Sequence, residues 1–242
     1  MPTARFAYVE MALPAFEAFM QGYVNRQIGL RRDIERASVV ADALLNLPDY
    51  LFASGESTKI KSAWPAARAY RESMWLQEPA YELVCDFANA YKHRDISRDE
   101  RKLNSIEDVI EVAAICRFHD DDGPYFRTLK RVHLRTTGGE VSDMRRLLAA
   151  AMRFWEHELV GLGVIPHAPR HLLKFSEAVP RNDAQTNTPL QLLARKGEYM
   201  ELKLECMEFY QSTSSLDFIA PDATFRAEAH IVTTVLESPF DA

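Results

Sequence analysis

No stretch of this sequence approaches the roughly 20 consecutive apolar residues that a helix needs to span a bilayer. The first ten residues, Met-Pro-Thr-Ala-Arg-Phe-Ala-Tyr-Val-Glu, also lack the apolar run of a signal peptide. We therefore expect a cytoplasmic protein that has no membrane partner.

Cysteine is scarce as well. The three cysteines, Cys85, Cys116 and Cys206, lie far apart in the chain. Their odd number argues against a disulfide framework, and the absence of close pairs argues against a zinc site. We expect reduced thiols in a reducing compartment and no bound metal.

Positive charge is not in excess, because the formal net charge is −6. This balance argues against indiscriminate nucleic-acid binding, which needs a net or clustered positive field. The sequence also has no Gly-rich phosphate loop, Gly-x-Ser-x-Gly elbow, His-Glu-x-x-His helix or dinucleotide-binding fingerprint. These absences disfavour the common hydrolase and cofactor mechanisms, and we expect no cofactor.

What the sequence does contain is typical of a globular protein. Hydrophobic residues make up 47% and charged residues 26% of the 242 residues. The order of periodic segments predicts an α+β fold: an antiparallel helical bundle with an inserted β-hairpin, followed by a small β-rich C-terminal region. We place the first domain at 1–163 and the irregular connection and β-rich region at 164–242.

Helical periodicity dominates the first part of the chain. From Pro14 to about Leu47 apolar residues mostly recur at steps of three and four, which predicts one long amphipathic helix that ends at Pro48. We expect a homodimer through this N-terminal helix. Further helices are predicted from Pro65 to about Trp75 and from Pro79 to about His93.

Beyond residue 109 the period changes from 3.6 to 2. Segments 110–118 and 125–136 alternate as strands and flank a turn, which predicts a β-hairpin. Ser142 is the expected N-cap of a helix that continues to Leu159. Two later strands, Met200–Cys206 and Phe225–Leu236, are expected to pair with each other.

The helix after Pro79 carries a polar stripe, defined here as Glu82, Asp86, Asn89 and His93. At 100° per residue these four positions fall at about 0°, 40°, 340° and 20° on the helix circumference. The apolar residues of the same helix occupy the opposite side. The polar stripe therefore faces either solvent or a cleft between helices.

Two interpretations of the polar stripe stay open. In a functional one, His93 is a general base or a metal ligand, and Asp86 or Asn89 positions a substrate or water by hydrogen bonds. In a structural one, the stripe is solvated, and Lys92 and His93 interact favourably with the negative end of the helix. The catalytic candidates are thus Asp86, Asn89 and His93.

The segment Asp86-Phe-Ala-Asn-Ala-Tyr-Lys-His93 resembles an Asn-Ala-x-Lys-His helix of uncharacterised bacterial proteins, in which a charged loop, a two-stranded element and a helix follow. The present sequence shows the same order from about Pro79 to Leu162. The resemblance implies a bacterial cytoplasmic protein and carries no known activity.

A more distant resemblance is to the HEPN group of small helical bundles, some of which are metal-independent ribonucleases with an Arg and a His separated by four to six residues on one helix. The matching segment is Arg127-Thr-Leu-Lys-Arg-Val-His133, which we place on a strand. The resemblance implies RNA or a nucleotide as partner.

A basic row on the same segment is independent of that resemblance. Arg127, Arg131, His133 and Arg135 share one face of the predicted strand. Such a row could bind phosphate or another anion through charge-assisted hydrogen bonds. Alternatively, it is the outer face of a two-stranded element, where charge prevents aggregation.

Two classes of function therefore remain. The first is a non-enzymatic interaction or ligand-binding protein, which fits the absence of a catalytic signature. The alternative is a HEPN-like RNA-processing or nucleotide-binding protein that uses His93 or the segment from Arg127 to His133.

Overall fold

A computed structural model shows an α+β protein, as the sequence predicts. The structure describes residues 3–22, 26–54, 58–93, 101–166, 181, 190–197, 203–211, 216–221, 225 and 231–237. Predicted features in 94–100 and in most of 165–189, including much of the proposed connection between the two domains, lie outside the described residues.

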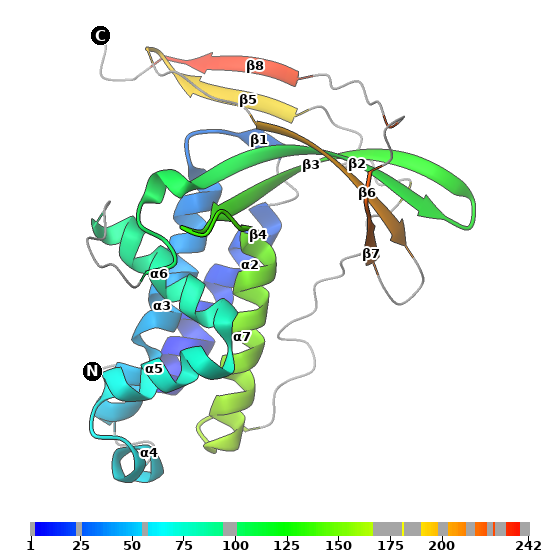
Figure 1. Cartoon of the computed structure of the whole chain (residues 1–242). Helices are drawn as coiled ribbons and strands as arrows, with labels where there is room; N and C mark the ends of the chain where they lie inside the picture. The colour runs from blue at the N-terminus through cyan, green and yellow to red at the C-terminus, as the bar shows by residue number, and fades with distance from the viewer. Residues whose placement is uncertain are drawn as a thin grey trace. The chain divides into compact units, whose positions relative to one another are not determined.

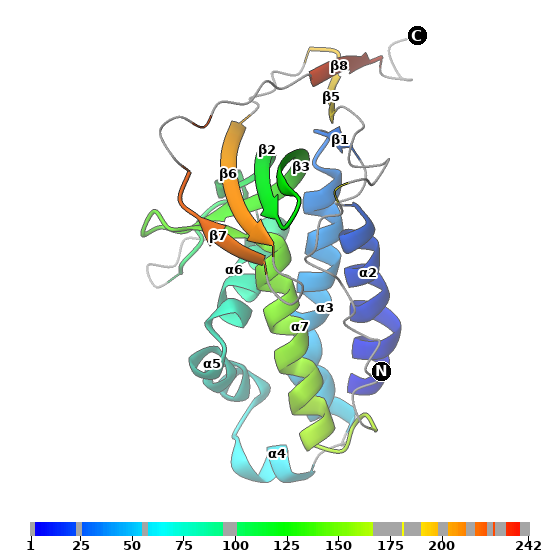
Figure 2. The same cartoon turned by 90° about the vertical axis from the view of Figure 1, so that its right-hand side faces the viewer.

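The helices occupy the N-terminal two thirds of the chain, and α2, α3 and α7 lie side by side (Figures 1 and 2). A π-helical segment at Ala7–Ala12 joins α1 to α2. The α-helices are α1 (Ala4–Phe6), α2 (Leu13–Gly22), α3 (Arg32–Ser54), α4 (Thr58–Ala63), α5 (Ala67–Gln77), α6 (Pro79–His93) and α7 (Met144–Gly161).

The single long helix predicted from Pro14 to Leu47 is wrong, because α2 and α3 are separate helices. The chain leaves helical geometry at β1 (Gln27–Ile28) and continues through Gly29, Leu30 and Arg31, whose φ angles are 102°, 57° and 52°. Left-handed backbone costs a non-glycine residue about 1–3 kcal/mol, so surrounding contacts must hold it. The apolar steps become irregular at this break, five residues from Tyr23 to Ile28 and two from Ile28 to Leu30, whereas regular steps on both sides favoured one continuous helix.

Glu111 supplies part of the contacts that hold this turn. Its carboxylate accepts hydrogen bonds from the backbone N–H of Gly29 at 2.5 Å and of Asp33 at 3.3 Å. It thereby caps the first turn of α3, whose N–H groups lack partners within the helix. Pro48, predicted to end the helix, lies inside α3.

The strands within the described residues form two sheets. One sheet has the order β1-β5-β8, in which β5 (Leu190–Arg195) pairs in parallel with both β1 and β8 (Ile231–Leu236). The other has the order β4-β3-β2-β6-β7 and contains the long curved hairpin of β2 and β3 (Figure 1). Its strands are β2 (Val109–Asp120), β3 (Gly123–Arg135), β4 (Val141–Asp143), β6 (Lys203–Gln211) and β7 (Leu216–Ile219).

The hairpin is confirmed, but the predicted pairing of the last two strands is wrong. Strand β6 pairs in parallel with β2, so that Phe209 lies opposite Phe118, and β8 belongs to the other sheet. Alternation of apolar and polar residues identifies a half-buried strand but not its partner. A second correction concerns α7, whose N-cap is Asp143 rather than Ser142: the Asp143 carboxylate accepts from the Arg145 N–H at 2.8 Å.

The chain forms two compact units, each built from separated segments. The first unit comprises 1–20, 34–110 and 133–174, and the second unit comprises 21–33, 111–132 and 175–242. The division cuts through β2 and β3 rather than falling at one point of the chain.

The core of the first unit is aromatic. Trp155 on α7 is fully buried, and its ring meets Tyr81 of α6 edge to face with centroids 5.3 Å apart. Tyr70 of α5 packs against the same indole at 6.3 Å. Edge-to-face pairs add about 0.5–1.5 kcal/mol beyond the apolar area that they bury. Trp155 thus links α5, α6 and α7.

The second unit has its own aromatic cluster. Phe118 of β2 stacks on Phe209 of β6 at 5.3 Å and on Tyr125 of β3 at 5.4 Å. Ala114 and Cys116 complete the buried side of this cluster. The alternating residues of β2 that predicted a strand therefore form its packed face.

A buried carboxyl on α7 makes stability depend on pH. Glu156 is 6% exposed, and burial raises its pKa above the ordinary value, while the Tyr8 hydroxyl, at 3.4 Å, acts in the opposite direction. In the window between the ordinary and the raised pKa, the folded protein holds a proton that the unfolded chain has released. Stability therefore falls as pH rises through that window.

The substitution Glu156→Gln removes this titration and keeps an acceptor for Tyr8. We expect the free energy of unfolding of the unsubstituted protein, minus that of Glu156→Gln, to decrease between about pH 4 and about pH 8. Urea denaturation at several pH values measures it. A difference that is constant or increases with pH would contradict the raised pKa.

Among the described residues, no helix is both long and apolar enough to cross a membrane.

Candidate functional site

Helix α6 begins and ends where the sequence predicts, at Pro79 and His93. Proline fits the first helical position because its missing N–H is not needed there. Glu82 in the first turn and Lys92 in the last turn complement the helix dipole. The opposite side of the helix is buried, with Val84 and Phe87 fully inaccessible.

The polar stripe of α6 lines a pocket that is open to solvent on one side. The pocket has a volume of about 720 Å³, and all of its lining residues belong to the first unit. Helices α3 and α5 provide the other sides, so we call it the α3–α5–α6 pocket. The lining residues are Leu45, Asn46 and Asp49 from α3, Arg68, Arg71, Glu72 and Trp75 from α5, Glu82, Asp86, Asn89, Lys92 and His93 from α6, and Arg101.

Asp86 is the most buried member of the polar stripe and is 2% exposed. One carboxylate oxygen pairs with the Arg101 guanidinium, and the other accepts the backbone N–H of Lys102 at 2.9 Å. Burial raises the pKa of Asp86 above its ordinary value, and the hydrogen bond and charge of Arg101 act in the opposite direction. Asp86 therefore attaches the chain after α6 to the pocket wall.

The other three members of the stripe have different environments. Glu82 pairs with the ammonium group of Lys102. The Asn89 side-chain N–H donates to the Cys85 carbonyl at 2.9 Å. His93 is exposed, and within the described part of the chain it forms no hydrogen bond or ion pair. The structure thus joins the three catalytic candidates Asp86, Asn89 and His93 in one pocket, with Asp86 already paired.

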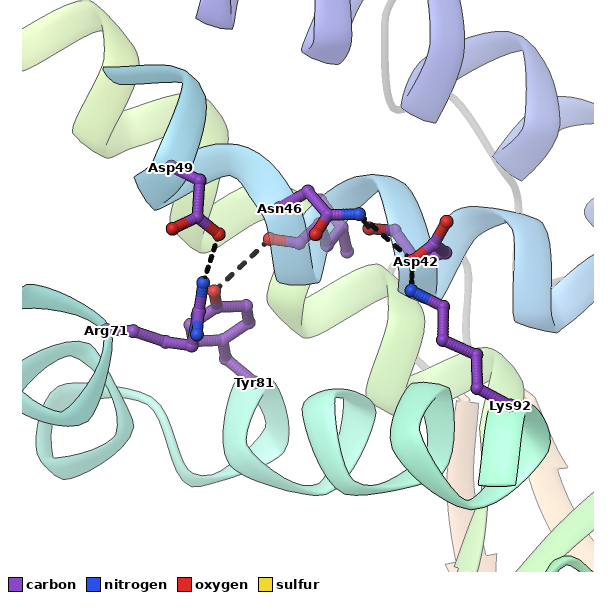
Figure 3. Close-up of polar contacts among 7 residues, drawn as sticks. Asp42, Asn46, Asp49, Arg71, Tyr81 and Lys92 are labelled. Atoms are coloured by element: carbon purple, nitrogen blue, oxygen red, sulfur yellow. Dashed lines mark hydrogen bonds and ion pairs between the residues drawn. The ribbon is translucent and has the colours of Figure 1, made fainter. Parts of the chain in front are cut away.

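Polar contacts between helices define the pocket's shape (Figure 3). Arg71 of α5 donates to Asp49 of α3 at 2.5 Å, and Lys92 of α6 pairs with Asp42 of α3. The Tyr81 hydroxyl donates to the Leu44 carbonyl at 3.2 Å. These contacts bridge α3 to both α5 and α6.

Residues of α3 and α5 were missed by sequence reasoning, although they complete the pocket. A signal was present, because Asp42, Asn46 and Asp49 recur at steps of four and three on α3. Arg68, Arg71 and Trp75 recur in the same way on α5. Such spacing places each set on one helix face, but it does not reveal that the faces meet.

Next to Asp86 in the chain, an unreactive thiol lies outside the pocket lining. Cys85 is fully buried, and burial raises its pKa to about 12, opposed by the indole of Trp75 and the hydroxyl of Tyr81. The thiolate is the nucleophilic form of cysteine, and it is scarce at neutral pH in such a site. On the open side, the Arg101 guanidinium lies 6.0 Å from the centre of the Trp75 ring.

The basic row lies on β3, as predicted, but it is not an outer solvated face. Arg127, Arg131 and His133 are 7%, 7% and 5% exposed, and only Arg135 is exposed. In the second unit, the Arg131 guanidinium lies 5.8 Å from the Phe209 ring centre, and that of Arg127 lies 5.2 Å from the Tyr125 ring centre. Parallel pairing of β6 with β2 brings the Phe209 ring into this region, so these arginines pack on aromatic rings.

No group of three or more His, Cys, Asp or Glu side chains among the described residues is arranged to bind a metal ion. A scan of protein-family models, a search of curated proteins and a search of solved structures gave no match to this chain.

Proposed function

We propose that this protein binds a small polar ligand in the α3–α5–α6 pocket and acts as a ligand-binding module. The observation that carries the proposal is the orientation of the polar stripe. Glu82, Asp86, Asn89 and His93 line a pocket whose other walls are also mostly polar. Concave sites in which polar groups from several elements converge are the usual places for small-molecule binding.

The pairing of the ionisable groups favours binding over catalysis. Arg101 engages Asp86, Arg71 engages Asp49, and the Cys85 thiol is protonated at neutral pH. A general base needs a titrating group within reach of a substrate proton, and a nucleophile needs an activating partner. Among the residues described in the pocket, His93 comes nearest to that requirement, and it forms no hydrogen bond to a residue that would orient it.

Saturation-transfer difference NMR on the full chain tests this proposal. The probes are three mixtures: the twenty L-amino acids, the four ribonucleosides and the four ribonucleoside monophosphates. We expect signal from at least one mixture. The Asn46→Leu/Asn89→Leu double variant replaces two polar side chains of the pocket by apolar ones of similar shape. It should weaken the binding at least about tenfold, because a lost hydrogen bond to a charged group has roughly that effect.

A matched control is available at Asn104, which is exposed, belongs to the first unit and does not line the pocket. The Asn104→Leu protein should bind the same probes with unchanged affinity. Absence of signal from all three mixtures would overturn the proposal, and so would equal signal from the double variant.

RNA binding or processing is the alternative function that the HEPN resemblance implies. A gel assay with a mixed-sequence oligoribonucleotide distinguishes it. Cleavage or binding that disappears in both His93→Ala and His133→Ala proteins would favour that alternative over a small-molecule ligand.

A further inference from the structure

The charge of the α3–α5–α6 pocket is balanced. Four cationic side chains line it, and so do four carboxylates. Two partners just outside the lining, Asp42 for Lys92 and Lys102 for Glu82, leave this balance unchanged. A ligand with a large net charge gains little overall Coulomb energy in such surroundings, whereas a ligand that carries both signs can meet an opposite charge at each end.

Two asparagines present fixed acceptors to the pocket. Asn46 donates its side-chain N–H to the Asp42 carbonyl at 2.8 Å, and Asn89 donates to the Cys85 carbonyl at 2.9 Å. A backbone carbonyl can only accept, so these bonds determine which end of each amide is nitrogen. The Oδ1 atoms of Asn46 and Asn89 accept no hydrogen bond within the described residues.

Arg71 brings a guanidinium to the same pocket. Its Nη2 donates to Asp49, and its Nε is buried out of reach of a ligand. The Arg71 side chain is 17% exposed, so a ligand meets the guanidinium at its remaining Nη–H groups. A planar guanidinium offers several donors in one plane and suits a carboxylate.

We propose that the ligand of this pocket is a small zwitterion, an amino acid or a dipeptide. Its ammonium group donates to Oδ1 of Asn46 and Asn89, and its carboxylate accepts from Arg71. The volume of about 720 Å³ leaves room for a side chain or a second residue. This inference rests on the proposed function and specifies the class of ligand.

Capped probes test the inference on the unaltered protein. Isothermal titration calorimetry compares the twenty L-amino acids and their glycyl dipeptides with N-acetyl amino acids, which lack the ammonium group, and with amino-acid amides, which lack the carboxylate. We expect at least one uncapped compound to bind. Both of its capped forms should bind at least about tenfold more weakly. Amino acids and dipeptides in separate arms distinguish the two sources of the zwitterion.

The Arg71→Lys variant provides a second readout, because it keeps the positive charge opposite Asp49 and removes the planar set of guanidinium donors. It should weaken the uncapped ligand about tenfold. It should leave the amide-capped form, which has no carboxylate, at its already reduced affinity.

Two results would overturn the inference. One is equal affinity for capped and uncapped forms, and the other is binding of ribonucleosides or monophosphates with no amino acid or dipeptide binding. The second result leaves the proposed pocket function intact. If no probe binds, both the proposed ligand-binding function and the inferred ligand class are wrong.

Discussion

Replacing Asp33 by alanine is expected to lower the free energy of unfolding by about 3–5 kcal/mol. Asp33 and Lys130 form an ion pair in the second unit, with side chains only 2% and 5% exposed. Lys130 also donates to the Gln27 carbonyl at 3.0 Å. Without Asp33 the buried ammonium group would lose its direct partner and keep only the Gln27 carbonyl and the charge of Glu111. Urea denaturation followed by far-UV circular dichroism measures the loss.

A double-mutant cycle distinguishes loss of the pair from loss of side-chain volume. The Asp33→Leu/Lys130→Met protein removes both charges and keeps apolar volume. It should recover most of the stability that Asp33→Leu or Lys130→Met alone loses. Additive losses would contradict a coupled buried pair.

Replacing Trp155 by alanine should lower the free energy of unfolding by about 3–5 kcal/mol as well. The indole is fully buried and lies against the rings of Tyr70 and Tyr81, so its removal leaves a cavity where three helices meet. Urea denaturation followed by circular dichroism measures this effect, and the remaining tryptophans, Trp64 and Trp75, report the first unit by fluorescence.

Leu76 provides the control for that prediction. It lies on α5 in the same unit and is 89% exposed. Leu76→Ala should change stability by no more than about 0.5 kcal/mol. If Trp155→Ala were equally mild, the aromatic cluster would not be the main core of the first unit.

The candidate site was half visible in the sequence. The spacing of Glu82, Asp86, Asn89 and His93 was sufficient to place them along one line of a helix, but whether that line faces solvent or a cleft stayed open. In the structure all four line the α3–α5–α6 pocket. The sequence did not show which residues pair with the polar stripe or complete the pocket. Arg101 pairs with Asp86, and Arg71 lies on a different helix. Such contacts depend on how the chain packs rather than on the spacing within one helix.

The sequence also did not show that Asp33 and Lys130 are buried. Asp33 falls where the sequence predicted the interior of a long helix, and Lys130 falls on a hairpin strand, so each resembled an ordinary surface residue. Their pairing requires the chain to break before α3 and to place Gln27 near β3. The irregular apolar steps from Tyr23 to Ile28 and from Ile28 to Leu30 coincide with the break, but a pattern of steps does not show which distant residues the chain then meets.

The sequence by itself determined the local elements. The prolines and apolar period defined α6, and the change of period together with the turn before Pro124 defined the hairpin, because both depend on interactions between residues close in the chain. Only the tertiary structure decided the rest: the separation of α2 from α3, the parallel pairing of β6 with β2 and the surface that the polar stripe faces. These depend on contacts between residues far apart in the chain, for which the one-dimensional pattern specifies a buried face but not the partner that covers it.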